Sequence, residues 1–280
     1  MEVSLNGAQN HDEFMVLNDA RCPRLTALFE QGLRISSDEL DAEQLDVIHT
    51  IEHACCWHAP LEWKLISYRD WFSCRRAAGK AVPAVLDQVS SRLDAATSRQ
   101  MHQIFEGGAS FTDDPEGTRN AALRLAIGRL CSLVVDTLGR PDGCLHLYSG
   151  HDWTLSPLLM CMVRPDDPML GQWPPFCSNL AIELWSTRPA DRKAAGGAGL
   201  SDPFCQGSEP SLADEGRHVR CVFNGQPVDM CCSPAGQQTC TLTEFKQMLS
   251  AFCVRDFAAE CRAGDPTSSG KQQAKPSFNR

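Results

Sequence analysis

One short segment constrains the fold more than any other part of the sequence. Residues 144–149 form a β-type run, Gly150 follows, and the dipeptide His151-Asp152 directly precedes a helix expected from Trp153 to about Cys161. A strand that passes through a glycine into a helix is typical of α/β proteins, in which ligands bind at the carboxyl ends of strands. The positive end of the helix dipole lies at the same point. The segment therefore predicts an anion site at the dipeptide, where Gly150 would let the backbone approach closely.

The dipeptide itself supports two interpretations. At an anion site, His151 could stabilise charge on a phosphoryl group while Asp152 protonates a leaving oxygen. Alternatively, Asp152 simply caps the helix and His151 is an exposed turn residue, which is the more frequent meaning of such a pair. The surrounding sequence has to decide between them.

The rest of the chain indicates an α/β fold with a mainly parallel sheet. Apolar residues recur at helical spacing in residues 22–33, 45–51, 82–105, 119–138 and 242–253. Strand-type runs occupy residues 179–185 and 218–223. We therefore expect a mainly helical segment over residues 1–140 and an α/β segment over residues 141–262. Within the second segment, residues 188–216 read as an inserted surface loop, and residues 263–280 read as a disordered tail.

Composition excludes several classes of partner. The formal net charge of -9 argues against a nucleic-acid partner. The sequence contains no uninterrupted run of about 18 apolar residues, so we expect no integral membrane segment. The first residues do not form a signal peptide, so either the chain is intracellular or its true start lies upstream.

The fifteen cysteines favour an oxidising compartment, where disulfides form. Their odd number leaves at least one thiol unpaired if the others are oxidised. Cys55-Cys56 and Cys231-Cys232 are adjacent pairs, and no C-x-x-C spacing occurs. This pattern does not fit a structural zinc site, and we expect neither a metal nor another cofactor.

Several segments resemble one family, in the order in which that family has them. Residues 147–160 read Leu-Tyr-Ser-Gly-His-Asp-Trp-Thr-Leu-Ser-Pro-Leu-Leu-Met and resemble a Y-S-A-H-D-x-T-x-x-x-L-L-M segment. Further likenesses are Trp173-Pro-Pro-Phe176 to W-P-P-F/Y, residues 182–185 to E-L-Y, residues 219–227 to V-R-V-x-Y-N-G, and residues 240–245 to C-P-L-x-x-F. Residues 17–24 and 125–130 are similar to the segment entering the family's helical cap and to the helix before its H-D strand. The family is the histidine acid phosphatases, and the lysophosphatidic acid and phosphoxylose phosphatases are the most similar types.

The resemblance implies a phosphoglycerate mutase-like sheet with a helical cap domain and a covalent reaction. In that family a histidine of an R-H-G-x-R-x-P motif attacks phosphorus, and arginines bind the phosphoryl oxygens. By resemblance, His151 binds the phosphoryl group and Asp152 is the proton donor. The substrate would be a phosphate monoester of a lipid, a sugar or an inositol. The cysteine content favours the secretory pathway, with a lysosomal or extracellular location, for a full-length form, whereas the first residues do not, so the sequence leaves the compartment open.

The sequence departs from the family at the nucleophile, because no Arg-His-Gly run occurs in it. Arg217-His218 is followed by Val219 and lies in a late strand. Without a nucleophile the covalent step cannot occur. Either the chain is a fragment of an active acid phosphatase, or it is a catalytically inactive remnant that binds a phospho-ligand or a partner. We favour the fragment, because a parallel sheet without its first strands would expose backbone edges. A third alternative is a disulfide-rich extracellular interaction domain without a ligand.

The resemblance also assigns residues outside the dipeptide. Residues 56–61 approximate a cap segment that lines the substrate pocket, which makes His58 a candidate substrate contact beside a structural or disulfide role for that region. Cys22 is similar to the cysteine that ties the cap to the C-terminal segment, with Cys261 as its partner, and Cys240 is expected to pair with Cys231 or Cys232. Two arginines, Arg129 and Arg164, are expected at the surface rather than at the site. Met160 and Met162 are expected in the core.

Overall fold

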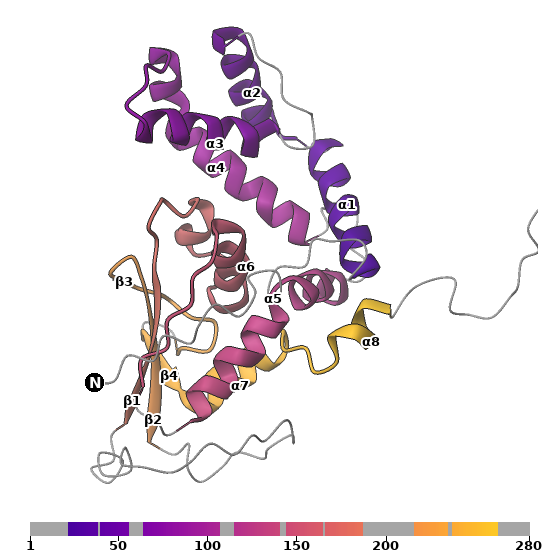
Figure 1. Ribbon diagram of the computed structural model, residues 1–280, viewed down its shortest axis with the longest axis vertical. Coiled ribbons are helices and arrows are strands. Elements are labelled where there is room, and N and C mark those ends of the chain that lie inside the picture. Colours follow the sequence, from indigo (N-terminus) through magenta and orange to yellow (C-terminus); the bar gives the residue numbers. More distant parts are fainter. Residues whose placement is uncertain are drawn as a thin grey trace, which may run out of the picture.

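The chain is a mixed α/β protein (Figure 1). The computed structural model describes residues 22–38, 40–55, 64–106, 115–140, 144–164, 166–186, 216–234 and 237–262. The helices are α1 (Pro23–Asp38), α2 (Ala42–Cys55), α3 (Lys64–Ala77), α4 (Ala84–Glu106), α5 (Pro115–Gly139), α6 (Asp152–Met162), α7 (Leu242–Ser250) and α8 (Phe257–Arg262), with a 3₁₀ turn η4 (Pro168–Gly171). The strands are β1 (Leu180–Ser186), β2 (Arg217–Phe223), β3 (Gln226–Pro227) and β4 (Thr239–Thr241).

The helices and strands expected from periodicity are confirmed, apart from the run at residues 144–149. The predicted loop lies outside the described residues except for Gly216, and the predicted tail at residues 263–280 lies outside them entirely.

The sheet is antiparallel wherever the structure describes it. β1 pairs with β2 from Leu180↔Phe223 to Ser186↔Arg217, and β3 and β4 both pair with β2. Asn224 and Gly225, which both have positive φ, make the tight turn between β2 and β3. A two-residue turn of this kind can join only antiparallel strands. The expectation of a mainly parallel sheet is therefore wrong for the described strands.

The strand expected at residues 144–149 does not form as a regular strand. Within the described ranges Leu145 makes a β-bridge, and residues 144–149 are part of no regular strand. The apolar side chains of this run are open to solvent, with Leu147 60% and Tyr148 51% exposed. A regular strand needs a continuous ladder of hydrogen bonds to a neighbouring strand, and strand composition alone does not provide one.

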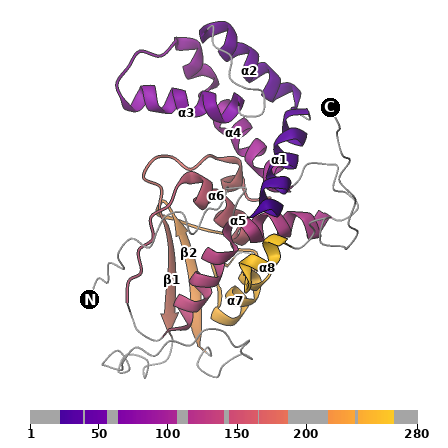
Figure 2. The same cartoon turned by 45° about the vertical axis from the view of Figure 1, so that its right-hand side comes forward.

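The apolar residues form two separate clusters that share one helix. The larger cluster joins the sheet with α5, α6, α7, α1 and the end of α4, and the smaller one joins α2, α3 and the beginning of α4. Figures 1 and 2 show this division, with α2, α3 and the first half of α4 set apart from the sheet. We call α2, α3 and residues 84–96 of α4 the outer helical unit.

The two clusters meet on α4 at a short polar stretch. Residues up to Ala96 belong to the smaller cluster, and residues from Met101 onward belong to the larger one. Between them lie Thr97, Ser98 and Gln100, which are polar and buried. The Thr97 hydroxyl donates to the Leu93 carbonyl at 2.7 Å, a bond within the helix itself. The boundary between the clusters is thus one polar turn of the continuous helix α4.

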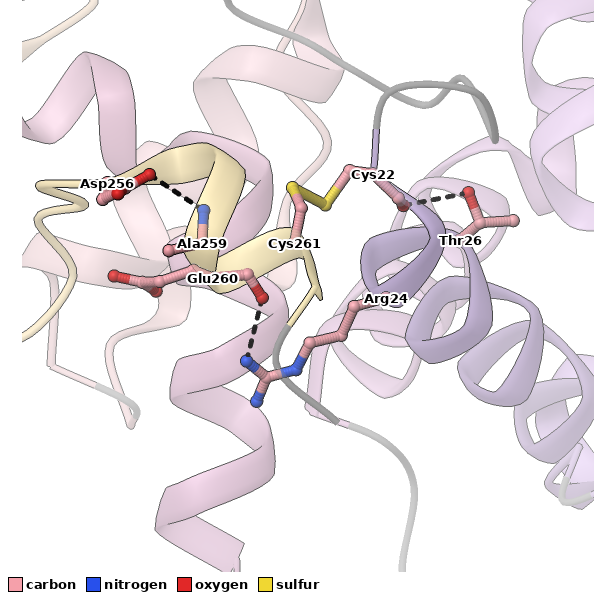
Figure 3. Close-up of a disulfide and its surroundings, with 7 residues drawn as sticks. All are labelled: Cys22, Arg24, Thr26, Asp256, Ala259, Glu260 and Cys261. Carbon is pink, nitrogen blue, oxygen red and sulfur yellow. Dashed lines mark hydrogen bonds between the residues drawn. A yellow bond between two sulfur atoms is a disulfide. The ribbon is translucent and has the colours of Figure 1, made fainter. Parts of the chain in front are cut away.

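A disulfide joins the two ends of the described chain. Cys22, just before α1, is bonded to Cys261 in α8, and their Cα atoms are 4.8 Å apart (Figure 3). Beside the bridge, the Arg24 guanidinium donates to the Glu260 carbonyl at 3.2 Å. This pairing confirms the partner inferred for Cys22 from the resemblance.

The structure also distinguishes between the two partners proposed for Cys240. The Sγ atoms of Cys232 and Cys240 are 2.8 Å apart, whereas the Cys231 thiol faces the Val163 carbonyl at 3.1 Å. The hydrogen bond between these two thiols lowers the pKa of Cys232 and raises the pKa of Cys240. Cys232 is therefore the residue placed to pair with Cys240 upon oxidation.

We expect the Cys22–Cys261 disulfide to contribute strongly to the free energy of unfolding. Its two cysteines are 239 residues apart in sequence. Closing a loop of this length restricts the unfolded chain, which corresponds to about 5 kcal/mol in the chain-entropy treatment. We expect Cys22→Ser to lower the free energy of unfolding in urea by roughly this amount, and reductant to lower that of the wild type similarly.

The matched control is Cys74→Ser, because Cys74 is an exposed free thiol. This substitution should leave the urea midpoint unchanged. Recovery of Cys22 and Cys261 as free thiols from folded, non-reduced protein would contradict the prediction.

Candidate functional site

The predicted dipeptide lies at the start of α6. His151 is the N-cap residue in extended conformation, and Asp152 is the first residue of the helix. The His151 side chain is exposed and makes no capping hydrogen bond. The alternative in which Asp152 caps the helix is therefore wrong by one residue. His151 occupies the N-cap position, and Asp152 is already helical.

The first amides of α6 already have acceptors. The Trp153 N–H donates to Oδ1 of Asp152 at 2.9 Å. The N–H groups of Thr154 and Leu155 donate to the His151 carbonyl at 2.9 and 3.0 Å. An anion here would therefore be held mainly by side chains and the helix dipole, not by these three amides as the sequence suggested.

Gly150 is required for space, not for an unusual backbone angle. Its φ is not among the positive values in the chain. A Cβ atom at this position would lie 3.2 Å from both Cβ and Cγ2 of Thr154. The glycine therefore allows residue 150 to lie tightly against the first turn of α6.

Two bonds fix the orientation of the Asp152 carboxylate. Oδ1 accepts from Trp153, as described above, and Oδ2 accepts from Nε1 of Trp173 at 2.9 Å. Trp173 is 4% exposed and meets the Trp153 ring edge-on, with centroids 6.4 Å apart. The Asp152 side chain is 30% exposed. The carboxylate is thus held by two hydrogen bonds while part of it remains exposed, next to the exposed His151.

A buried arginine lies behind this carboxylate. Arg69 in α3 has a side chain that is only 7% exposed, and its Nη1 is 3.9 Å from Oδ2 of Asp152. Its guanidinium lies over the ring of Trp173, 5.2 Å from the centroid, and donates to the Pro174 carbonyl at 3.4 Å. Arg69 therefore brings the outer helical unit into contact with the site.

Two further carboxylates surround Arg69. Asp70 is 3.3 Å from Nη1, and Asp94 of α4 is 3.5 Å from Nε. Burial raises the pKa of Asp70 and of Asp94, against the lowering effect of the Arg69 charge, and the Asp152 charge adds to the rise for Asp70. With three carboxylates around one guanidinium, the cluster is net negative when all are ionised.

The other residues singled out from the sequence lie elsewhere. His58 falls outside the described residues. Arg129 lies over the Phe257 ring, and Arg164 pairs with Asp229 at 3.2 Å, so neither is part of the described contacts of Asp152. Met160 and Met162 are buried, which confirms their place in the core. Arg69 was missed, since residues 63–72 showed only an aromatic-rich pattern.

Neither of two hollows close to α6 includes the dipeptide in its lining. A wider one of about 380 Å³ is lined by residues of α4 and η4, among them Arg99, His102 and Asp167. A small one of about 10 Å³, enough for one water molecule, lies against Ser98, Ser156 and Trp173. The dipeptide itself lies at the surface, with His151 exposed and Asp152 partly exposed.

Searches of the described ranges find no group of three or more His, Cys, Asp or Glu side chains that could hold a metal ion. The helices in those same ranges are all too short or too polar to cross a bilayer. Neither a protein-family model nor a curated protein matches the sequence. Function must therefore be argued from the site itself and from the resemblance of short segments.

The raised pKa of Asp94 predicts a pH-dependent stability effect. A carboxyl that binds its proton more tightly in the folded state than at its ordinary pKa of 3.8 destabilises the fold once it ionises. That penalty is present above the folded pKa and disappears as pH falls through it. We expect Asp94→Asn to raise the melting temperature at pH 7 but not at pH 3. The half-exposed position keeps the gain small, on the order of 1–2 °C.

Glu244→Gln is the control of opposite sign. Hydrogen bonds from Thr241 lower the pKa of Glu244, so its ionised form stabilises the fold above pH 4.5. This substitution should lower the melting temperature at pH 7 and have little effect at pH 3. An equal gain for Asp94→Asn at both pH values would show that charge is not the cause.

Proposed function

We propose that this chain provides the proton donor and part of the phosphate site of an acid phosphatase that acts through a phosphohistidine. The observation that carries the proposal is the hydrogen bond from Trp173 to Asp152. It joins Trp173-Pro-Pro-Phe176 to the His-Asp segment, the two stretches of sequence with the most specific likeness to the histidine acid phosphatases. A direct contact between them supports a shared site more than either likeness alone does.

The geometry suits the proposed division of roles. His151 is exposed at the positive end of α6, where a phosphoryl group would be stabilised. Asp152 has both oxygens oriented and its outer side open, as a proton donor to a leaving oxygen requires. In the proposed reaction a histidine supplied by a further segment attacks phosphorus, and the bond to the leaving oxygen breaks as Asp152 protonates that oxygen. Water then hydrolyses the phosphohistidine.

The exposed run before the dipeptide supports the proposal that a further segment completes the sheet. Leu145, Leu147 and Tyr148 lie within four consecutive residues, yet all three are more than 40% exposed. A strand buried on both faces is typically this apolar. We propose that a strand carrying the nucleophilic histidine covers this run in the full-length form.

The rival proposal is a catalytically inactive remnant that binds a phospho-ligand. It rests on the sequence itself, which contains no Arg-His-Gly run. Both proposals use the same site and predict that inorganic phosphate or vanadate binds there, so only turnover separates them.

Turnover can be tested on a chain extended upstream. If the genomic sequence before Met1 encodes Arg-His-Gly in frame, the extended protein is expected to hydrolyse a chromogenic phosphate ester at acidic pH, and the 280-residue chain is not. Asp152→Asn in the extended protein should lower kcat by about 10²–10⁴-fold, because it removes the proton donor. The measurement is the initial rate, with the folded state verified by circular dichroism.

Arg220→Lys is the matched control, because Arg220 also pairs with a carboxylate and lies over a tryptophan, but on the sheet. It should leave kcat unchanged. An extended chain that binds phosphate without turnover would support the remnant. Activity of the 280-residue chain itself, abolished by Asp152→Ala, would refute the need for a further nucleophile.

A further inference from the structure

The contacts of Arg69 connect two parts of the molecule that share little else. Arg69 belongs to α3 of the outer helical unit, and its side chain contacts Asp152, Trp173 and Pro174 beside the sheet. Its neighbour Ile66 also reaches the larger apolar cluster. The proposed proton donor is therefore bordered by a charge that the outer helical unit supplies.

The distances show what kind of contact this is. Nη1 of Arg69 is 3.9 Å from Oδ2 of Asp152, too far for a hydrogen bond but close enough for an ion pair. The bond that Oδ2 does accept comes from Trp173, whose ring also lies under the guanidinium. Trp173 and Arg69 therefore both lie beside this oxygen, and the effect of Arg69 on Asp152 is electrostatic.

Without the charge of Arg69, the carboxylates around it would repel one another. Asp70 and Asp94 lie within 3.5 Å of the guanidinium, as described above, and the charge of Asp152 acts on Asp70. A neutral residue at position 69 would leave three carboxylates facing one another in a partly buried space. Like charges brought together in this way repel one another, and Asp152, whose Oδ2 is held by the bond from Trp173, would be displaced toward solvent.

We infer that Arg69 is a positioning residue for Asp152, and that its charge, 3.9 Å from Oδ2, keeps this carboxylate against the indole N–H of Trp173. The role of Asp152 as proton donor rests on the proposed function, but the positioning does not. In either case the outer helical unit is a part of the site and not only a cover.

The indole N–H of Trp173 is a direct probe of this arrangement. In the ¹⁵N-labelled 280-residue chain, its NMR signal can be assigned by its loss in Trp173→Phe. We expect Asp152→Asn and Arg69→Gln to shift the signal, and Arg220→Gln to leave it in place. Because the contact acts through charge, Arg69→Lys should keep the signal near the wild-type position. An unchanged Trp173 signal in folded Arg69→Gln would overturn the inference.

Inorganic phosphate provides the second comparison. Added phosphate should shift the Trp173 signal of the wild type, and the dissociation constant should rise about tenfold in Arg69→Gln but little in Arg69→Lys, because a nearby positive charge is lost only in the first. If phosphate moves no signal of the wild type, the proposed phosphate site is wrong, while the ligand-free spectra still decide the role of Arg69.

One further variant allows for a folding failure of Arg69→Gln. Changing Asp70 and Asp94 to asparagine in the same chain removes the unpaired charges that would cause it. In that triple variant Asp152 has lost the cation and also its two repelling neighbours, so the Trp173 signal should return toward the wild-type position. A signal displaced as far as in Asp152→Asn would contradict an electrostatic role for Arg69.

Discussion

Burial of one guanidinium determines how the helical part of this protein meets its α/β part. Removing the charge of Arg69 from water is unfavourable unless opposite charges accompany it, and three carboxylates from α3, α4 and α6 do so. The guanidinium also lies over the rings of Trp173 and Phe176, with its carbon 5.2 and 5.9 Å from their centroids. Because the acidic partners come from three helices, these helices can adopt only arrangements in which all three reach the same cation.

Local patterns in the sequence predicted the parts of the fold that depend on neighbours along the chain. The apolar spacing of α4 and the turn residues at Asn224-Gly225 carry their own signals. The strand, glycine and helix pattern located His151 and Asp152 within one residue of their places at the start of α6. The pairing of Cys22 with Cys261 needed more than local pattern, and it came from the resemblance of distant segments.

What the sequence did not predict depends on partners far along the chain. Arg69 lies in an aromatic-rich helix, and nothing nearby in sequence indicates that Asp152, 83 positions later, would be its counter-ion. Residues 144–149 have strand composition, but a strand also needs neighbours to bond with, and composition cannot supply them. The resemblance implied a mainly parallel sheet, whereas the described strands are antiparallel. The tight turn at Asn224-Gly225 requires this of β2 and β3.

The polar turn within α4 has a consequence for how the molecule opens. Apolar clusters unfold cooperatively when they are continuous, and Thr97, Ser98 and Gln100 interrupt that continuity. A boundary of this kind favours local opening of the outer helical unit while the sheet stays intact. Because Arg69 belongs to that unit, such an opening would also remove the cation from behind Asp152, so that the opening equilibrium of these helices and the electrostatics of the site would be coupled.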